Sequence, residues 1–178
     1  HELMVYNTAN NGRVSENRSV TGVVLAVSRQ NQKVLVNDTV RQLFYLVSTN
    51  GSIAGTFGGL GTAAQWTPDG KTLYVTDSAS AGAGHTNTLY VYNASTGWTT
   101  YPLATSGGTS GPQNLALTIP GVGAYISGDP TVAHTWCPTG TPGDYASMSF
   151  YPQGDSVNVN TEVLAATTDG MHILGAAA

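Results

Sequence analysis

The sequence predicts an all-β fold, a β-propeller built from four-stranded blades of roughly 40–50 residues. The first observation is composition: charged residues make up 9% of the 178 residues, whereas a soluble globular domain carries about 25%. Thr, Ser, Asn, Gly and Pro instead account for 80 of the 178 residues. Long salt-bridged helices need Glu, Lys and Arg, so this composition excludes them. The second observation is a frame of short strands and turns that recurs along the chain.

The frame is clearest between residues 62 and 104. Segment 67–78 begins with Pro-Asp-Gly and continues as an alternating strand, and segment 88–97 is a second such strand ending in Ser-Thr-Gly. Gly in these turns can adopt a positive φ, while the β-branched and aromatic residues of Leu-Tyr-Val-Tyr favour a pleated strand. The two segments therefore predict two strands of one antiparallel sheet.

The same frame occurs on both sides of this region. Aligning Ser28, Thr67, Thr118 and Thr167 gives spacings of 39, 51 and 49 residues. A short strand precedes each of these positions, at residues 22–27, 62–66, 114–117 and 162–166, and outer strands follow at 52–57 and 98–103. The predicted organisation is a partial blade at 1–14, blades at 22–60, 62–104 and 114–155, and a partial blade at 162–178.

Packing of one blade on the next explains the low charge. A blade cannot bury both faces of its sheet alone, so its neighbours must cover them. Polar residues are then needed only at turns, rims and outer edges. A β-sandwich would also contain short strands, but nothing in that fold requires a repeat of about 40 residues.

The motif Pro-Asp-Gly-Lys-x-Leu-Tyr-Val, followed by Leu-Tyr-Val-Tyr-Asn-x-x-Thr-Gly, resembles the YVTN repeat of bacterial and archaeal propellers. It is also similar to the lactonase-like propeller group. The resemblance is strong over residues 62–104, fair over 22–60 and weak over 114–155. It implies a fold rather than an activity, because the motifs are turns and core strands.

The two partial blades allow two interpretations. The chain begins with the last two strands of a blade and ends with the first two, so its termini could pair and close a four-bladed ring. Propellers of the resembled family usually have seven blades, which favours instead a piece of a longer propeller. Self-association through the open ends is then expected.

An aspartate recurs after the second strand of three blades, at Asp38, Asp77 and Asp129. On a propeller these positions lie on one rim, and three converging carboxylates suit Ca²⁺, which binds oxygen ligands. Alternatively, each aspartate closes a turn by accepting a hydrogen bond from the backbone two residues on. The turn interpretation is favoured, because equivalent positions on adjacent blades are too far apart to share one ion.

Two insertions, at 78–87 and 130–145, follow second strands on the same rim. Loops carry function more often than frameworks do, so we expect a ligand site there. Trp136 is the candidate for stacking on a sugar. The candidate ligand-binding residues are His85, His134, Trp136 and Tyr145.

These insertions also contain Cys137, the single cysteine of the chain. With His85 and His134 it supplies the ligand types of a zinc site. Solvated loop histidines and a cysteine that pairs outside this chain are the favoured alternative.

Charge and motifs exclude several classes of function. With 6 basic and 10 acidic residues the net charge is −4, so nucleic acid and anionic membranes are not expected as partners. No apolar run approaches the roughly 18 residues of a membrane span. The chain has no Gly-x-Ser-x-Gly elbow, phosphate-binding loop or His-Glu-x-x-His motif. Few Lys and many Thr and Asn favour an exported protein, extracellular, at the cell surface or periplasmic.

Two functions remain. The first is a non-catalytic, exported binding or cell-surface module that presents its rim loops to a protein or carbohydrate partner. The second is a lactonase-like hydrolase, for which the resemblance implies a divalent cation at the mouth of the central channel. The channel-lining strands offer only Gln65 and Asn114, with Glu162 at an entrance, which is a poor cation cage. We expect no cofactor. Ca²⁺ at the three aspartates is the alternative to this expectation.

The chain also contains four Asn-x-Ser/Thr sequences, which arise easily in a chain this rich in Asn, Ser and Thr and are acceptors for N-linked glycans only in a secretory host. They begin at Asn17, Asn37, Asn50 and Asn93.

Overall fold

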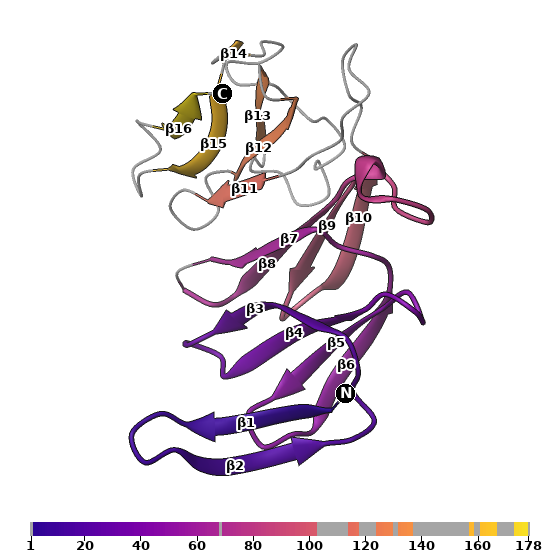
Figure 1. The fold of residues 1–178 in the computed structure, drawn as a ribbon, viewed down its shortest axis with the longest axis vertical. Coiled ribbons are helices and arrows are strands. Elements are labelled where there is room, and N and C mark those ends of the chain that lie inside the picture. Colours follow the sequence, from indigo (N-terminus) through magenta and orange to yellow (C-terminus); the bar gives the residue numbers. More distant parts are fainter. Residues whose placement is uncertain are drawn as a thin grey trace. The chain divides into compact units, whose positions relative to one another are not determined.

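A computed structural model of the chain describes residues 2–67, 69–102, 114–117, 124–129, 132–136, 157–158, 161–166 and 173–177. The paired strands among them are all antiparallel. They form three four-stranded and two two-stranded sheets (Figure 1). The prediction of an all-β fold is therefore confirmed. The helix of the described part, the 3-10 turn Ala79–Ala81, is far too short to cross a membrane, and no described helix meets that requirement.

The chain divides into two compact units, His1–Gly61 and Thr62–Ala178. In the first unit, β1 (Leu3–Asn7) and β2 (Gly12–Asn17) form a hairpin. The next four strands form a meander in the order β3-β4-β5-β6. Its strands are β3 (Val23–Ser28), β4 (Lys33–Asp38), β5 (Leu43–Ser48) and β6 (Ile53–Gly58).

The second unit repeats this pattern. One meander consists of β7 (Ala63–Trp66), β8 (Thr72–Asp77), β9 (Thr88–Asn93) and β10 (Gly97–Pro102). A second consists of β11 (Asn114–Leu117), β12 (Ala124–Asp129), β13 (Val132–Trp136) and β14 (Val157–Asn158). A hairpin of β15 (Thr161–Ala166) and β16 (Ile173–Ala177) completes the described strands.

The recurring frame of the sequence corresponds to these sheets. The strands β4, β8 and β12 are each second in their sheet, and they end at Asp38, Asp77 and Asp129. The three aspartates therefore occupy equivalent positions, as the repeat predicts. The number of blades, and whether the two ends of the chain pair with each other, stay predictions.

One sequence-based expectation is wrong. Residues 130–145 are expected as a loop, but 132–136 form β13, which pairs with β12. The segment Val-Ala-His-Thr-Trp contains two β-branched residues and ends in an aromatic residue, which favours a strand.

Both faces of the first meander are buried at its central strands. On one face Val34 and Val36 pack with Tyr45 and Val47, and Val20 joins this cluster. The side chains of Leu3 in β1 and Leu43 pack against the same cluster. On the opposite face Leu35, Phe44 and Leu46 are almost completely buried. This burial accounts for the near-continuous apolar runs of β4 and β5.

The second meander is buried in the same way. Leu73 and Val75 in β8 and Leu89 in β9 have no exposed surface. The ring of Tyr92 lies between two tryptophans, edge-on to Trp66 at 6.1 Å and tilted against Trp98 at 5.2 Å between centroids. Trp66 and Trp98 therefore both contribute aromatic packing to the second meander.

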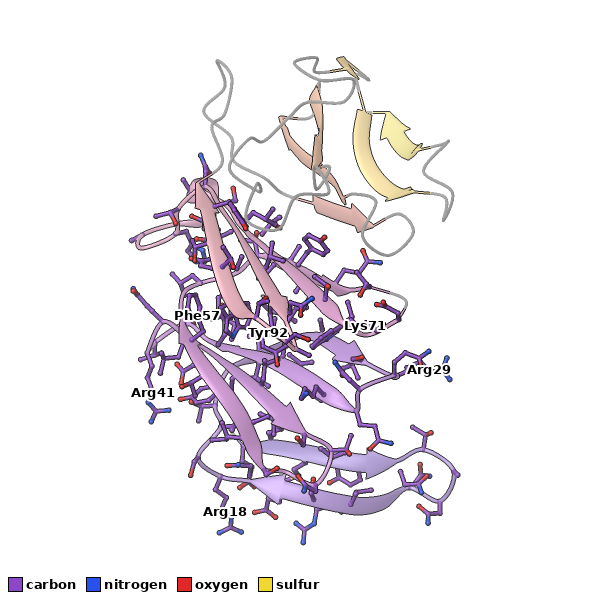
Figure 2. All side chains as sticks on the ribbon, turned by 180° about the vertical axis from the view of Figure 1, so that it is seen from behind. Arg18, Arg29, Arg41, Phe57, Lys71 and Tyr92 are labelled. Atoms are coloured by element: carbon purple, nitrogen blue, oxygen red, sulfur yellow. The ribbon has the colours of Figure 1, made fainter. Side chains whose placement is uncertain are left out.

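Long basic side chains are directed away from these cores. Figure 2 shows Arg18, Arg29 and Arg41 projecting from the ribbon, and all three residues are exposed. These three arginines lie in turns between strands.

Asn37 connects the end of the first meander to the segment that follows it. Its side chain is 1% exposed. The Nδ2 group donates to the carbonyl oxygens of Leu43 at 3.1 Å and Gly59 at 3.2 Å, and Oδ1 accepts from Gly61 N at 3.0 Å. One buried amide therefore forms hydrogen bonds to three backbone groups, two of which belong to the segment after β6.

We expect Asn37→Ala to lower the free energy of unfolding by roughly 1–3 kcal/mol, because it leaves buried backbone groups unsatisfied. Urea denaturation of the two proteins measures the difference. The control is Asn50→Ala, whose side chain is exposed and should change stability by less than about 0.5 kcal/mol. Equal losses in the two variants would contradict the role of Asn37.

Candidate functional site

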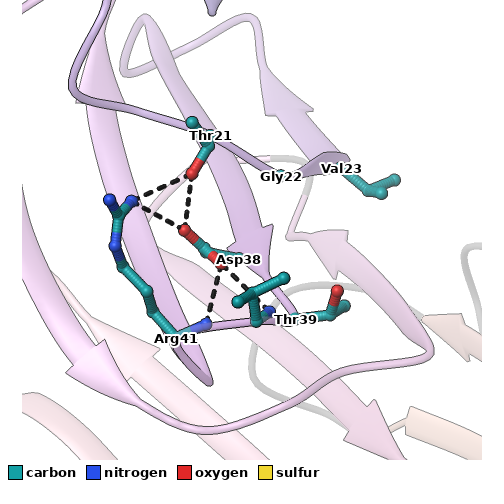
Figure 3. Close-up of a pocket in the computed structure, with 7 residues that line it drawn as sticks. Thr21, Gly22, Val23, Asp38, Thr39 and Arg41 are labelled. Carbon is teal, nitrogen blue, oxygen red and sulfur yellow. Dashed lines mark hydrogen bonds and ion pairs between the residues drawn. The ribbon is translucent and has the colours of Figure 1, made fainter. Parts of the chain in front are cut away.

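The carboxylate of Asp38 organises the end of the first meander where β3 begins and β4 ends. Its Oδ1 accepts from Val40 N at 3.1 Å and Arg41 N at 2.9 Å, closing the turn that leads to β5. Its Oδ2 accepts from the Thr21 hydroxyl at 2.6 Å and from Arg41 Nη1 at 3.0 Å. Arg41 Nη1 also donates to Thr21 Oγ1 at 3.0 Å, so the three side chains form a closed triangle (Figure 3).

The backbone beside this triangle is held in a conformation that requires glycine. Gly22 has a φ of +130°, and a Cβ atom there would lie 2.2 Å from the carbonyl oxygen of Asn37. A larger residue would therefore clash with the backbone of β4 and is also disfavoured by its φ. This close approach fixes the position of Thr21 relative to Asp38.

A surface hollow of about 400 Å³ opens beside the triangle. Val40, at the tip of the turn, is 92% exposed, and Val23 at the start of β3 is 58% exposed. The guanidinium-bearing side chain of Arg41 is 56% exposed, while that of Asp38 is 4% exposed. We call this hollow the rim pocket; it is lined by Thr21, Gly22, Val23, Asp38, Thr39, Val40 and Arg41.

Hydrogen bonding changes the acidity of Asp38. The Thr21 hydroxyl and then the Arg41 backbone N–H and guanidinium lower the pKa of this carboxyl, because they stabilise its charged form. Asp38 in turn raises the pKa of Arg41. At neutral pH the rim pocket therefore contains a fixed ion pair with the guanidinium on its exposed side.

Asp77 holds a longer loop at the equivalent position of the second unit. Its Oδ1 lies 2.5 Å from His85 Nδ1, and its Oδ2 accepts from Thr86 N at 2.6 Å. The Asp77 side chain is 1% exposed and that of His85 is 15% exposed. A further bond from Ala79 N to Asn87 Oδ1, at 2.8 Å, closes the loop at its base. His85 is thus a structural partner of Asp77 and is not a freely solvated loop residue.

The other predicted site residues are placed only in part. Asp129 is the last residue of β12, and His134 and Trp136 belong to β13. Tyr145 and Cys137 lie outside the described residues. Within the described part of the chain no group of three or more His, Cys, Asp or Glu could hold a metal ion. The Ca²⁺ and zinc sites stay predictions, and Asp38 would have to give up its present hydrogen bonds to bind a cation.

The residues that the sequence analysis missed are Thr21, Val40 and Arg41. Arg41 follows Asp38 by three residues in a turn, which is a recognisable signal for an ion pair. Thr21 comes from a segment 17 residues earlier, so only the pairing of β3 with β4 brings it to Asp38.

Repeated four-stranded antiparallel meanders are typical of a propeller-like fold, which comparison with solved structures supports. The chain is similar to Hsv2 of the yeast Kluyveromyces lactis, a β-propeller protein. The TM-score is 0.52 at 17% identity, over 74% of this chain and 47% of that chain. The chain is also similar to KlHsv2 with loop 6CD replaced by a Gly-Ser linker. The TM-score is 0.53 at 21% identity, over 71% of this chain and 43% of that chain.

The chain thus spans less than half the length of these two structures. At such identities the likeness establishes the fold alone. No family model and no curated protein matches the chain. The resemblance to YVTN repeats therefore stays a prediction.

We expect Thr21→Val to raise the pKa of Asp38, because it removes the strongest of the hydrogen bonds that lower it. Since the folded pKa is below the unfolded value of about 3.9, the unfolded chain binds the proton more tightly. The stabilisation is therefore complete above pH ~4 and is lost as pH falls through the folded pKa. The variant should lose less stability over this range than the wild type.

An NMR titration of the Asp38 carboxyl carbon measures this change. Thr39→Val, on the same turn, is the matched control, since the Thr39 side chain is exposed. An unchanged Asp38 pKa in Thr21→Val would contradict the assigned cause.

We expect Asp77→Ala to release the loop between β8 and β9, because the substitution removes the acceptors of His85 and Thr86. Hydrogen exchange of the Thr86 amide should become faster, while amides in β8 keep their protection. A Ca²⁺ titration of the wild type and this variant tests the alternative role. A Ca²⁺-dependent rise in melting temperature that Asp77→Ala abolishes would favour a cation site over a loop anchor.

Proposed function

We propose that the chain is part of a non-catalytic, exported binding module with a propeller-like fold, which contacts a protein partner at the rim pocket. One observation carries this proposal. The hydrogen-bonded side chains of Thr21, Asp38 and Arg41 and the exposed Val23 and Val40 surround the same open pocket. The low charge and the abundance of Thr and Asn support export, and the repeats resemble those of surface proteins with YVTN propellers.

The geometry of the pocket suits binding because its polar groups are already in place. Asp38 and Thr21 hold the Arg41 guanidinium, so little side-chain freedom is lost when a partner binds. The close approach of Gly22 to the Asn37 carbonyl likewise fixes the backbone that lines the pocket. A partner then meets a preformed surface.

The apolar residues suit insertion into a partner. A single exposed valine on a protein surface needs no explanation. Here Val40 and Val23 flank the same hollow and adjoin an exposed arginine. Arginine is enriched among the residues that contribute most to binding at protein interfaces.

The lining favours a protein over a carbohydrate. None of the seven residues of the rim pocket is aromatic, so the pocket offers no ring on which a sugar could stack. A stable protein interface buries about 800 Å² on each partner. The surrounding rim must therefore also take part, with the pocket at its centre.

The lactonase-like alternative gains no specific support from the described residues. The rim pocket contains one carboxylate, and that carboxylate is already paired with Arg41. We therefore do not assign a hydrolytic reaction to it.

A displayed peptide library selected on the immobilised wild-type chain provides the probe for this site. We expect Val40→Asp to weaken binding of the selected peptides at least tenfold, which corresponds to about 1.4 kcal/mol. The reason is that a second carboxylate replaces an apolar anchor. Val14→Asp is the matched control, because Val14 is also an exposed valine in the first unit but lies in β2.

Equal affinity of Val40→Asp and wild type would contradict binding at the rim pocket. A glycan array that gives signals abolished by Val40→Asp would transfer the site to a carbohydrate partner. Hydrolysis of lactones by the purified chain, lost on treatment with a chelator, would overturn the non-catalytic assignment.

A further inference from the structure

The four Asn-x-Ser/Thr sequences differ in whether the asparagine amide is accessible. The acceptor atom for an N-linked glycan is Nδ2, and a large hydrophilic glycan must lie on the surface. Asn37 fails both conditions, since it is 1% exposed and its Nδ2 donates to two carbonyl groups. A glycan on Asn37 is incompatible with the first meander.

In two further asparagines, Nδ2 donates a hydrogen bond to another segment of the chain. Asn17 Nδ2 donates to the carbonyl of Gly51 at 2.7 Å, across 34 residues of sequence. Asn93 Nδ2 donates to Thr72 Oγ1 at 3.3 Å, between β9 and β8. Both residues are partly buried. A glycan on either residue would replace one of the two Nδ2 hydrogens, at a partly buried nitrogen that already contacts a separate segment.

Asn50 is different. It is exposed in the turn between β5 and β6. Its Oδ1 accepts from Ser52 N at 3.0 Å and from Ser52 Oγ at 2.7 Å. Its Nδ2 has no hydrogen-bond partner in the described part of the chain. The carbonyl side of the amide is therefore held by the serine of its own Asn-Gly-Ser sequence, while the nitrogen is available.

Backbone geometry and hydrogen bonds define the turn itself. Gly51 adopts a φ of +85°, and its N–H donates to the carbonyl of Ser48 at 2.8 Å. The same residue is buried against the neighbouring hairpin, where a Cβ would lie 3.3 Å from Glu16 O. Gly51 thus faces the protein while Asn50 faces solvent.

We propose that Asn50 is an N-glycosylation site and that it is the main one of the four. The donor is a lipid-linked diphospho-oligosaccharide, transferred by a membrane oligosaccharyltransferase. Asn50 Nδ2 forms a bond to C1 of the first sugar, and the C1–O bond to the diphosphate breaks. The electron pair leaves on the lipid diphosphate, and the amide proton passes to a base of the transferase. The inference rests on the export that the proposed function includes.

The test is secretion of the full chain behind a cleavable signal peptide from a eukaryotic host. Occupancy is read on the membrane fraction and in the medium by amidase treatment in ¹⁸O-water and peptide mass spectrometry. Release of a glycan converts its asparagine to a labelled aspartate. We expect the label at residue 50 and none at residue 37.

Variants separate the acceptor from the turn. Asn50→Gln and Ser52→Ala should each remove the main glycan without changing the melting temperature by more than a few degrees, because both side chains are exposed. Ser52→Thr keeps the hydroxyl and should keep the glycan. Asn93→Gln is the matched control and should leave the glycan in place.

An unmodified wild-type chain, a main glycan that persists in Asn50→Gln, or occupancy of Asn37 would each overturn the proposal. Peptide binding at the rim pocket is measured on unglycosylated protein, so it can fail or succeed independently. A chain that binds peptides through Val40 but lacks the glycan would refute this inference alone.

Discussion

Burial of both faces of the central strands is the constraint on which the rest of the structure depends. Because β4 and β5 are apolar on each face, backbone groups at their ends have little access to water and must find partners within the protein. Two adjacent residues at the end of β4 meet this requirement. Asn37 forms hydrogen bonds to backbone groups of Leu43 and of the segment after β6. Asp38 accepts hydrogen bonds from the backbone of the turn into β5 and from the Thr21 hydroxyl just before β3. Their side chains point to opposite faces, since successive residues of a strand alternate.

The rim pocket is a consequence of this constraint. The same hydrogen bonds that satisfy the strand ends also place Thr21 and Arg41 around Asp38. The close approach of Gly22 to the backbone of Asn37 brings the start of β3 against them. A surface that is suited to binding therefore arises from residues whose first role is to complete the sheet.

Much of the fold could be predicted from sequence because strands and turns are encoded locally. The alternation of Leu-Tyr-Val-Tyr and the Pro-Asp-Gly turn located β8 and β9, and the repeat placed Asp38, Asp77 and Asp129 at equivalent strand ends. The segment at 132–136 was misassigned because the repeat placed it in an insertion after the second strand, although its β-branched and aromatic residues favour a strand.

The site itself could be predicted only in part. Asp38 was recognised from its position in the repeat, whereas its partner Thr21 depends on the pairing of distant segments. For His85 the residue type suggested a ligand, but the structure gives it a partner in Asp77. Local patterns do not reveal such pairings, because they depend on where the chain returns after a turn.

The aspartate at the end of the second strand has a consequence for the design of new loops. In the first unit it anchors a short turn, and in the second it anchors an insertion of ten residues, 78–87. In both cases the carboxylate accepts hydrogen bonds from backbone N–H groups, which every residue except proline supplies. The length and composition of the segment can therefore vary while its base stays attached to the sheet. This end of the fold is a natural graft point for foreign peptides, with the aspartate retained as the clamp.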